Sequence, residues 1–340
     1  MNWSDAQQRQ RSSHRSRKDS VNHPTAISQT STASAIKYLF KAMRPKQWVK
    51  NAFVFAGIVF AEQHLFTNTW ALAKTGAAFV LFCLISSSVY LINDLADIER
   101  DRQHPRKRTR PLASGKLSPT LARTTAILLS LGCLAGSAAI AFAAAPNDMG
   151  WTWFSLVLLL YFVLQIAYTF VLKNVVIIDL FAIAAGFVLR ALGGAAILSV
   201  TITSWWLMCV LFLALFLGLG KRRNELQVLE GGAGDHRRIL QEYSPQFLEQ
   251  LLTIDVACTI IAYSMATFTA PSVPKEPYPF LMLTIPFVVY AMFRYMYLII
   301  QKGEGGEPAE LLFRDRPFLI SIVAWGLLVL VILMVSGQQG

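Results

Sequence analysis

Apolar residues along this chain of 340 residues fall into long runs, which short polar segments separate. A transmembrane α-helix needs about 20 consecutive, largely apolar residues. We therefore expect an all-α, polytopic membrane protein, in which the boundary between the fourth and fifth spans rests on Lys173 and Asn174 alone. The pattern predicts nine spans, near residues 50–62, 71–92, 121–145, 151–172, 175–198, 205–220, 251–270, 279–300 and 318–335.

The polar segments outside these runs predict how the chain is organised. Residues 1–35 are rich in Ser, Thr, Gln, Arg and His and contain no sustained apolar stretch, which is typical of a disordered, basic tail. Residues 36–340 then form a single transmembrane domain with two long loops, at 93–118 and 221–250.

Positive charge is distributed unevenly between the two sides of the predicted bundle. Of the 31 lysines and arginines, 26 fall in the segments on the side of the N-terminus, and the opposite connections hold only Lys275. Because cytoplasmic loops carry the excess of Lys and Arg, this asymmetry predicts a cytoplasmic N-terminus and, with nine spans, a C-terminus outside. We expect an integral membrane protein with any chemistry in its cytoplasmic loops.

Composition excludes an ordinary soluble domain. Charged residues make up 15% of the chain, whereas soluble domains carry about 25%. The four cysteines lie inside apolar runs without a CxxC pair, so we expect buried thiols rather than a disulfide framework or a zinc site. The net charge of +11 suits anionic lipid, nucleic acid or phosphorylated substrates. Its position in membrane-flanking loops favours lipid and phosphate, so no nucleic-acid partner is expected.

Acidic residues gather where the second predicted span ends. Asp94, Asp97 and Asp101 have the spacing i, i+3 and i+7, which places them on one face of a helix, with Asn93 at its edge. Like charges on one face repel each other unless a cation lies between them. Carboxylates, water and phosphate oxygens are the ligands of Mg²⁺. The alternative is a solvated helix end with ordinary surface acids.

Basic residues follow these acids at once, in a segment too rich in proline and charge to continue as a helix. Acids that hold a metal ion, beside bases that hold phosphate, are the combination that diphosphate chemistry needs. The membrane topology alone also predicts some of these bases, so each one is individually a weak indication. They are Arg100, Arg102, Arg106, Lys107, Arg108, Arg110 and Lys116.

The same residues carry a resemblance to a known family. Asn93-Asp94-x-x-Asp97-x-x-x-Asp101, followed by His104-Pro105 and Arg110-Pro111-x-x-Ser114-Gly115, resembles the first signature of the UbiA superfamily. Tyr168-Thr169-x-x-x-Lys173 with Asp179 is similar to its segment between the fourth and fifth helices. The resemblance covers residues 36–335. It implies a UbiA-like bundle of nine helices with the N-terminus inside, and transfer from diphosphates with Mg²⁺.

One departure from the family pattern narrows the expected substrates. Members that prenylate aromatic acceptors carry a second acidic motif after the sixth helix, where this chain reads Lys221-Arg222-Arg223-Asn224-Glu225. Together with the segment 44–51, this is similar to the branch that transfers phosphoribosyl groups to decaprenyl phosphate. The resemblance then implies 5-phosphoribosyl 1-diphosphate as donor and a polyprenyl phosphate as acceptor, in the plasma (inner) membrane of a bacterium. Cationic clusters neutralise such anionic substrates, whereas a second acidic motif would repel them.

These observations give a set of expected site residues. Asp94 and Asp97, with Asn93, are the expected catalytic residues, and Asp94, Asp97 and Asp101 the expected ligands of Mg²⁺. Arg190 is a charge well inside a span, where charges usually face a cavity or a partner. Asp255 and Arg294 could pair with each other. The expected substrate-binding residues are Lys46, Lys50, Asn51, Arg106, Arg110, Tyr168, Lys173, Asp179, Arg190, Lys221, Arg222, Arg223 and Glu225.

Other functions stay open at this stage. Prenyl transfer from a polyprenyl diphosphate to an aromatic acid or quinone precursor is the alternative within the family. A transporter of a phosphorylated lipid or metabolite would predict broken helix pairs and polar groups at mid-membrane, whereas here the polar clusters gather on one side. A scaffold would explain the basic loops but not the aspartates. The oligomeric state is left open, with a homo-oligomer as one option.

Overall fold

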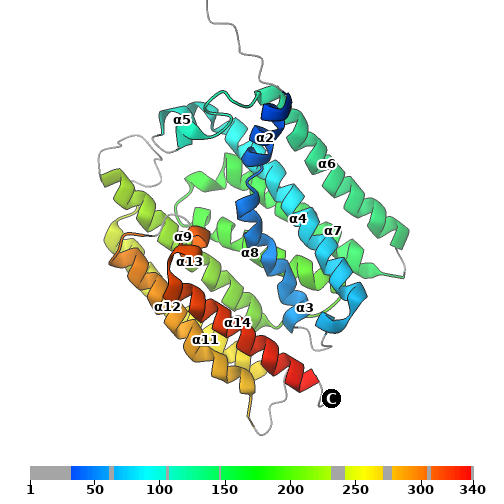
Figure 1. Ribbon diagram of the computed structural model, residues 1–340, viewed down its shortest axis with the longest axis vertical. Coiled ribbons are helices and arrows are strands. Elements are labelled where there is room, and N and C mark those ends of the chain that lie inside the picture. The colour runs from blue at the N-terminus through cyan, green and yellow to red at the C-terminus, as the bar shows by residue number, and fades with distance from the viewer. Residues whose placement is uncertain are drawn as a thin grey trace, which may run out of the picture.

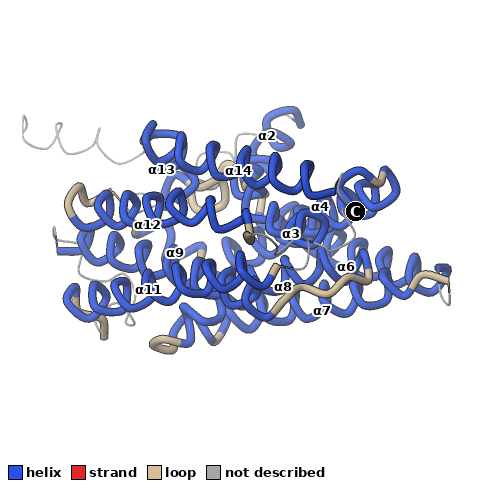
Figure 2. The backbone as a smooth tube through the Cα atoms, turned by 90° about the horizontal axis from the view of Figure 1, so that it is seen from below, coloured by secondary structure: helices blue, strands red, loops and turns tan. Residues whose placement is uncertain are grey.

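The regular structure of this chain is helical throughout the part that the computed structural model describes, which is residues 32–60, 65–104, 107–144, 147–230, 242–270, 278–304 and 308–337 (Figure 2). In this part of the chain, eight helices are long and apolar enough to cross a membrane. The prediction of an all-α, polytopic membrane protein is confirmed.

The long helices run side by side as one bundle, with α2 and α5 at one end and the C-terminus at the other (Figure 1). Their bounds agree with the predicted spans to within a few residues for most of the chain. In order, the elements are α2 (Thr32–Ala42), η1 (Pro45–Phe55), α3 (Ala56–Phe60), η2 (Leu65–Thr67), α4 (Thr69–Ala96), α5 (Ile98–Gln103), η3 (Lys107–Thr109), α6 (Pro119–Ala144), α7 (Met149–Phe170), η4 (Leu172–Asn174), α8 (Ile178–Leu198), α9 (Ser204–Glu230), α11 (Pro245–Thr269), η5 (Phe280–Thr284), α12 (Ile285–Ile300), α13 (Pro308–Arg314) and α14 (Arg316–Gly337).

The predicted first span has an unusual form. Instead of one α-helix near 50–62, η1 is a 3₁₀-helix of 11 residues, and α3 adds five α-helical residues. A 3₁₀-helix rises about 2.0 Å per residue and an α-helix about 1.5 Å, so the two together extend about 30 Å. This is about the thickness of the hydrocarbon core of a bilayer. The count of nine spans therefore stays a prediction.

Local sequence explains where several helices begin. The Asn68 side chain accepts hydrogen bonds from the backbone N–H groups of Trp70 and Ala71 and caps α4. Ser244 caps α11 in the same way, with Pro245 at the first helical position. These are the residue types that best satisfy the unpaired N–H groups of a first helical turn.

Helix extends into the three polar segments predicted between or before the spans, while the division into tail, domain and loops stays a prediction. Of the predicted tail of 1–35, residues 32–35 lie in α2. The predicted loop of 221–250 begins and ends in helix, because α9 continues to Glu230 and α11 starts at Pro245. Lys, Arg, Glu, Gln and Leu are good helix formers, so α9 continues beyond its apolar run. The predicted loop at 93–118 likewise begins with the end of α4 and with α5.

The helix α8 lies at the centre of the bundle and contacts η1, α3, α4, α7 and α9. Glycines bring its backbone close to the first span. A Cβ atom on Gly194 would lie 1.8 Å from the Val54 carbonyl oxygen, and one on Gly57 would lie 2.7 Å from Gly194. Small residues allow such close approach between membrane helices. This contact sets the position of η1 against α8.

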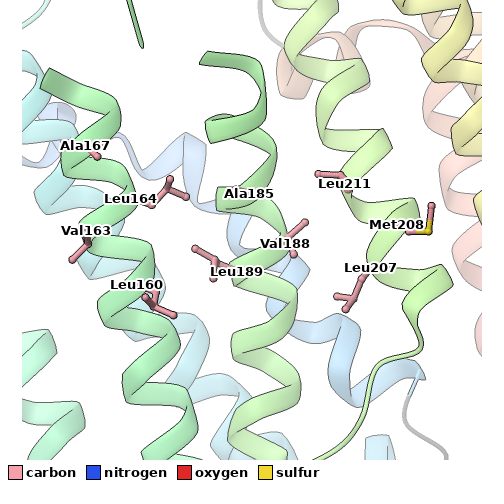
Figure 3. Close-up of a pocket in the computed structure, with 10 residues that line it drawn as sticks. All are labelled: Leu160, Val163, Leu164, Ala167, Ala185, Val188, Leu189, Leu207, Met208 and Leu211. Carbon is pink, nitrogen blue, oxygen red and sulfur yellow. The ribbon is translucent and has the colours of Figure 1, made fainter. Parts of the chain in front are cut away.

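Two apolar spaces lie among the helices. A cavity of about 510 Å³ is lined by η1, α3, α8, α9, α11, α12 and α14, with Phe53, Phe216 and Tyr295 in its wall. A shallower groove of about 680 Å³ has α8 as its floor, between α7 and α9 (Figure 3). Only Leu, Val, Ala and Met side chains line this groove. The groove therefore fits hydrocarbon and carries no group that could do chemistry.

Candidate active site

The acidic residues at the end of α4 lie in a network of ion pairs. The Asp94 carboxylate is buried and accepts hydrogen bonds from Arg44 and, at 3.2 Å, from Arg110 Nη1. The same Arg110 nitrogen donates to Asp101 Oδ2 at 2.6 Å. Asp94 and Asp101 therefore flank a single guanidinium group and face one another across it.

Asp97 faces a cation from a distant part of the chain. Lys173 Nζ, in η4, donates to both carboxylate oxygens of Asp97 at 2.9 Å, and Lys173 is only 4% exposed. Arg100 lies 3.4 Å from the same carboxylate, on the solvent side. The segment between α7 and α8 is thereby held against the end of α4.

The spacing predicted that the three carboxylates lie on one helix face. In the structure they do not, because the helix is interrupted between them. The helix α4 ends at Ala96, and α5 begins at Ile98 after a break at Asp97, whose backbone has φ −106° and ψ 12°. The break turns α5 away from the axis of α4. Asp94 and Asp101 nevertheless come together, through Arg110.

Backbone features position the two arginines. Arg44 adopts a left-handed conformation with φ 55°, at the junction of α2 and η1, and its guanidinium group lies 4.9 Å from the centre of the Tyr90 ring. Arg110 is followed by a loop that Leu112 and Leu117 anchor in the core, where they pack with Leu91 of α4. Both cations are therefore brought to Asp94 by buried contacts rather than by flexible surface chains.

The carboxylates offer the oxygen ligands that Mg²⁺ prefers. Among the described residues, no group of three or more His, Cys, Asp or Glu side chains is arranged to hold a metal ion. Arg44, Arg110 and Lys173 take the places around the carboxylates that a cation would take. The residue types fit the metal, and the cations would have to move to admit it.

A second polar cluster joins α8, α9 and the end of α7. Arg222 is 2% exposed and donates from Nε to Asp179 Oδ2 at 2.7 Å, from Nη1 to Glu225, and from Nη2 to the Tyr168 hydroxyl at 3.4 Å. The Tyr243 hydroxyl donates to the other oxygen of Asp179 at 2.9 Å. Asp179 is completely buried. A buried charge needs partners of this kind, so the cluster is a closed set of pairs.

The neighbouring Arg223 has a different set of partners. Its Nε and Nη2 atoms donate to Glu249 of α11 at 2.9 and 2.7 Å, and Nη1 donates to the Ile299 carbonyl oxygen of α12 at 2.7 Å. Arg223 therefore ties the ends of three helices together, those of α9, α11 and α12. Of the predicted basic triad, Arg222 and Arg223 are buried and Lys221 is half-buried.

Arg190 lies deep in the bundle among uncharged partners. Its Nε atom donates to Asn51 Oδ1, Nη1 to the Gly186 carbonyl oxygen and Nη2 to the Tyr161 hydroxyl, each at 2.7 Å. Its guanidinium carbon lies 4.7 Å from the centre of the Tyr161 ring. No carboxylate pairs with Arg190 in the described part of the chain. The predicted residues Asn51 and Arg190 are thus brought together.

The remaining predicted residues lie around these clusters. Asn93 is half-buried next to Asp94, Lys46 is exposed at the start of η1, and Lys50 is half-buried one turn later. Arg106 lies outside the described residues. The suggested pair of Asp255 and Arg294 is wrong, because Arg294 pairs with Asp315 at 2.8 Å.

Several residues of the site were not predicted. Arg44, Tyr161, Tyr243 and Glu249 complete the clusters. Arg44 had a weak signal, because a cation directly before Pro45 marks the start of the first span. Tyr243 had none, since one tyrosine in a polar segment looks like any surface residue.

Comparison with known proteins gives a consistent match. Residues 51–323 match the UbiA prenyltransferase family. The decaprenyl-phosphate phosphoribosyltransferase of Mycobacterium tuberculosis is 32% identical over 298 residues, which cover 86% of this chain and 93% of that protein. The protein of the same name in Mycolicibacterium smegmatis is 33% identical, over 84% of this chain and 89% of that protein. The one in Corynebacterium glutamicum is 32% identical, over 89% and 90%.

Solved structures with a similar fold include a UbiA homologue from Archaeoglobus fulgidus. Its structure bound to GPP and Mg²⁺ has a TM-score of 0.63 at 19% identity, over 89% of this chain and 98% of that one. Its structure bound to DMAPP and Mg²⁺ has a TM-score of 0.64 at 20% identity, over 88% and 99%. At this level of identity the likeness concerns the fold alone.

Proposed function

Because this chain belongs to the UbiA prenyltransferase family, it is a membrane-embedded transferase, and we propose its reaction. It transfers the 5-phosphoribosyl group of 5-phosphoribosyl 1-diphosphate to a polyprenyl phosphate and releases diphosphate. The reaction requires Mg²⁺ and takes place at the cytoplasmic face of a bacterial inner membrane. One observation carries the choice of substrates: the relatives that match over nearly their whole lengths are named for phosphoribosyl transfer to decaprenyl phosphate.

The charges of the site agree with this choice. Both substrates are anionic, and the cations Arg44, Arg110 and Lys173 each contact one of the carboxylates of this segment. At the position where the resemblance implies a second acidic motif for aromatic acceptors, this chain has the buried pairs of Arg222 and Arg223.

The apolar cavity supports a lipid acceptor. Its wall includes α9 side chains between Trp206 and Leu217, and Arg222 of the polar cluster follows on the same helix. A polyprenyl tail in this cavity would place its phosphate toward that end of the bundle. The apolar tail then stays out of water while the phosphate meets a soluble donor.

The carboxylates of Asp94, Asp97 and Asp101 hold the metal ion in this proposal. When bound, Mg²⁺ supplies positive charge that stabilises the departing diphosphate. Arg44, Arg110 and Lys173 exchange their carboxylate partners for phosphate oxygens of the donor, with exposed Lys46 and half-buried Lys50 nearby on η1. Bidentate contacts from arginine suit phosphate groups in particular.

The bonding changes of the reaction need little from the protein beyond placement. The bond between the ribose anomeric carbon and the diphosphate oxygen breaks, and an oxygen of the lipid phosphate bonds to the same carbon from the opposite face. The configuration of that carbon is inverted. Because the nucleophile is already an anion, no strong general base is required, and catalysis rests on positioning and on charge stabilisation.

The second cluster has a supporting role in this proposal. Arg222 donates hydrogen bonds to Asp179, Glu225 and Tyr168. A substrate can therefore contact only the exposed atoms of these side chains. Glu225 is 27% exposed at its side chain and is the member best placed to orient a ribose hydroxyl.

A direct assay tests the proposal and its nearest rival. The detergent-purified protein with Mg²⁺ is offered 5-phosphoribosyl 1-diphosphate with a polyprenyl phosphate and, in parallel, a prenyl diphosphate with 4-hydroxybenzoate. We expect a phosphoribosylated lipid by mass spectrometry, and its loss with EDTA. A prenylated aromatic product instead would overturn the choice of substrates.

Variants of the acidic segment test the role of the carboxylates. Asp97→Asn should lower the transfer rate by about 100-fold or more, because the metal loses a charged ligand. The matched control is Glu99→Gln, two residues on, where the carboxylate is 80% exposed and pairs with Arg102. Equal activity of the two variants would contradict the assignment of the metal ligands.

A further inference from the structure

The connection between α7 and α8 contains a strained turn. Ile177 has φ 69° and ψ −45°, and the Ile178 N–H donates to the Val176 carbonyl oxygen at 2.8 Å. This is the geometry of the rare γ-turn with a positive φ at its central residue. A β-branched residue with positive φ is a genuine outlier, since its Cβ atom clashes with the backbone. Such strain persists only where the surroundings hold it.

The side chain of Ile177 does not hold the turn, because Ile177 is 42% exposed. The turn is held through its backbone, by a hydrogen bond to Tyr243, which lies just before α11. The Ile177 N–H donates to the Tyr243 hydroxyl at 2.7 Å, and that hydroxyl donates to Asp179 Oδ1 at 2.9 Å. One buried hydroxyl group therefore joins the turn to the start of α8.

The electrostatic surroundings keep this hydroxyl able to donate. Burial raises the pKa of Tyr243 to about 12, and the neighbouring carboxylate of Asp179 also raises it. The hydroxyl therefore stays protonated at any pH at which the protein works. Asp179 is in turn fixed by Arg222, at 2.7 Å.

The strained turn follows directly after the residue that contacts the acidic cluster. Lys173 lies four residues before Ile177, and its ammonium group contacts both oxygens of Asp97. The intervening chain is short and internally bonded, from Val175 N–H to the Leu172 carbonyl oxygen and from Asp179 N–H to the Val175 carbonyl oxygen. A change in the turn therefore moves Lys173.

From this geometry we propose that Tyr243 is a positioning residue, which holds the turn at Ile177 in its strained form and thereby fixes Lys173 against Asp97. The role in catalysis rests on the proposed function, because Lys173 would there exchange Asp97 for the donor diphosphate. The position of Lys173 itself does not depend on which substrates the protein uses.

The variant Tyr243→Phe tests the proposal in the full-length protein. It removes the hydroxyl group and keeps the ring, which stacks on Phe247. The turn should relax, and Lys173, now 4% exposed, should become more reactive toward an amine-directed reagent. We expect about tenfold faster labelling of Lys173, measured by peptide mass spectrometry, together with faster hydrogen exchange in the peptide 171–180.

A rescue variant separates positioning from general damage. Glycine adopts positive φ without strain, so Ile177→Gly should keep the turn without the hydroxyl. In the Tyr243→Phe background, Ile177→Gly should return the labelling of Lys173 toward that of the wild type. Absence of rescue in a protein that elutes as a single folded species would overturn the proposal. Tyr278→Phe, at an exposed tyrosine, is the control and should change neither rate.

The kinetic test uses the transfer assay. Tyr243→Phe should lower kcat/KM for the diphosphate donor by about tenfold and leave KM for the lipid phosphate within about twofold. Equal losses for both substrates would mean general damage and would overturn the positioning role. If the wild-type protein transfers no phosphoribosyl group, the proposed function fails, whereas the labelling of Lys173 still decides whether Tyr243 holds the turn.

Discussion

At the scale of single residues, the chain satisfies its buried charges with partners that lie far away in sequence. Arg190 takes its acceptors from η1, α7 and its own helix, all of them uncharged. A buried cation without a carboxylate is costly, so its hydrogen bonds must be complete. Arg190 therefore binds the first span to the centre of the bundle.

A double-mutant cycle measures this contribution. Arg190→Met leaves Asn51 Oδ1 and the Tyr161 hydroxyl without their donor, which should lower the free energy of unfolding by about 2 kcal/mol. Asn51→Ala in the Arg190→Met background should cost less than Asn51→Ala alone, because the two residues share one hydrogen bond. Thermal unfolding in detergent is the measurement, and strictly additive shifts would contradict the coupling.

The sequence predicted the anions of the site better than their partners. Asp94, Asp97 and Asp101 lie within eight residues of sequence, so their spacing alone predicts an acidic cluster. Arg44 lies 50 residues before Asp94, and Lys173 lies 76 residues after Asp97. Spacing along one helix carries no information on contacts of this range, so the ion pairs appear only in the fold.

At the scale of elements, the contact of η1 and α3 with α8 decides where Arg44 and Asn51 lie. The backbones touch because Gly194 has no side chain, since a Cβ atom there would overlap the Val54 carbonyl oxygen. The atom in the way is backbone, which cannot move without shifting the whole span.

Two glycine substitutions test this contact. Gly194→Ala should destabilise the protein by about 2 kcal/mol or more and lower its activity, because η1 is displaced from α8. Gly132→Ala on α6 is the matched control. A Cβ there meets nothing within 4 Å, so the higher helix propensity of alanine should stabilise by up to about 1 kcal/mol. Similar melting temperatures for the two variants would contradict the packing argument.

The start of α14 gives a prediction for pH. Asp315 accepts two hydrogen bonds from Arg294 and one from the Phe318 N–H, and the bonds from Arg294 hold its pKa below the usual value. The pair therefore contributes stability above pH about 4, and the contribution is lost as the pH falls through the lowered pKa. Asp315→Asn should melt below the wild type at pH 7. The difference should shrink as the pH falls below about 4, and a constant difference would contradict the ionic origin.

The sequence predicted the apolar parts of the elements and misjudged their polar ends. Hydrophobic runs predict where a helix can cross a membrane, but α9 continues beyond its apolar run on good helix formers such as Lys221 and Glu225. The break at Asp97 was also unforeseen, since no glycine or proline marks it. Polar helix ends carry the site here, so the least predictable parts of the elements are those that matter most.

At the scale of the whole molecule, both polar clusters lie at the same end of the bundle. The end of α4, the end of α7, the start of α8 and the end of α9 meet there. The distribution of Lys and Arg predicts that this end faces the cytoplasm.

Labelling of single cysteines tests that orientation. In a chain whose four native cysteines are replaced, Thr201→Cys lies in the exposed connection between α8 and α9, and Ser114→Cys lies in the exposed loop before α6. An impermeant maleimide should label position 201 in intact cells and position 114 only after lysis. The reverse pattern would place the site outside and contradict the proposed location.

The ion pairs around Asp94, Asp97 and Asp101 also bear on the order of ligand binding. Three carboxylates and the cations Arg44, Arg110 and Lys173 already balance one another. A free divalent cation would add charge to a neutral site, and a free diphosphate would find the cations occupied. A metal complex of the donor brings both signs at once, so that the carboxylates and the cations can exchange partners together. The site therefore favours arrival of metal and donor as one species, and weak binding of either alone.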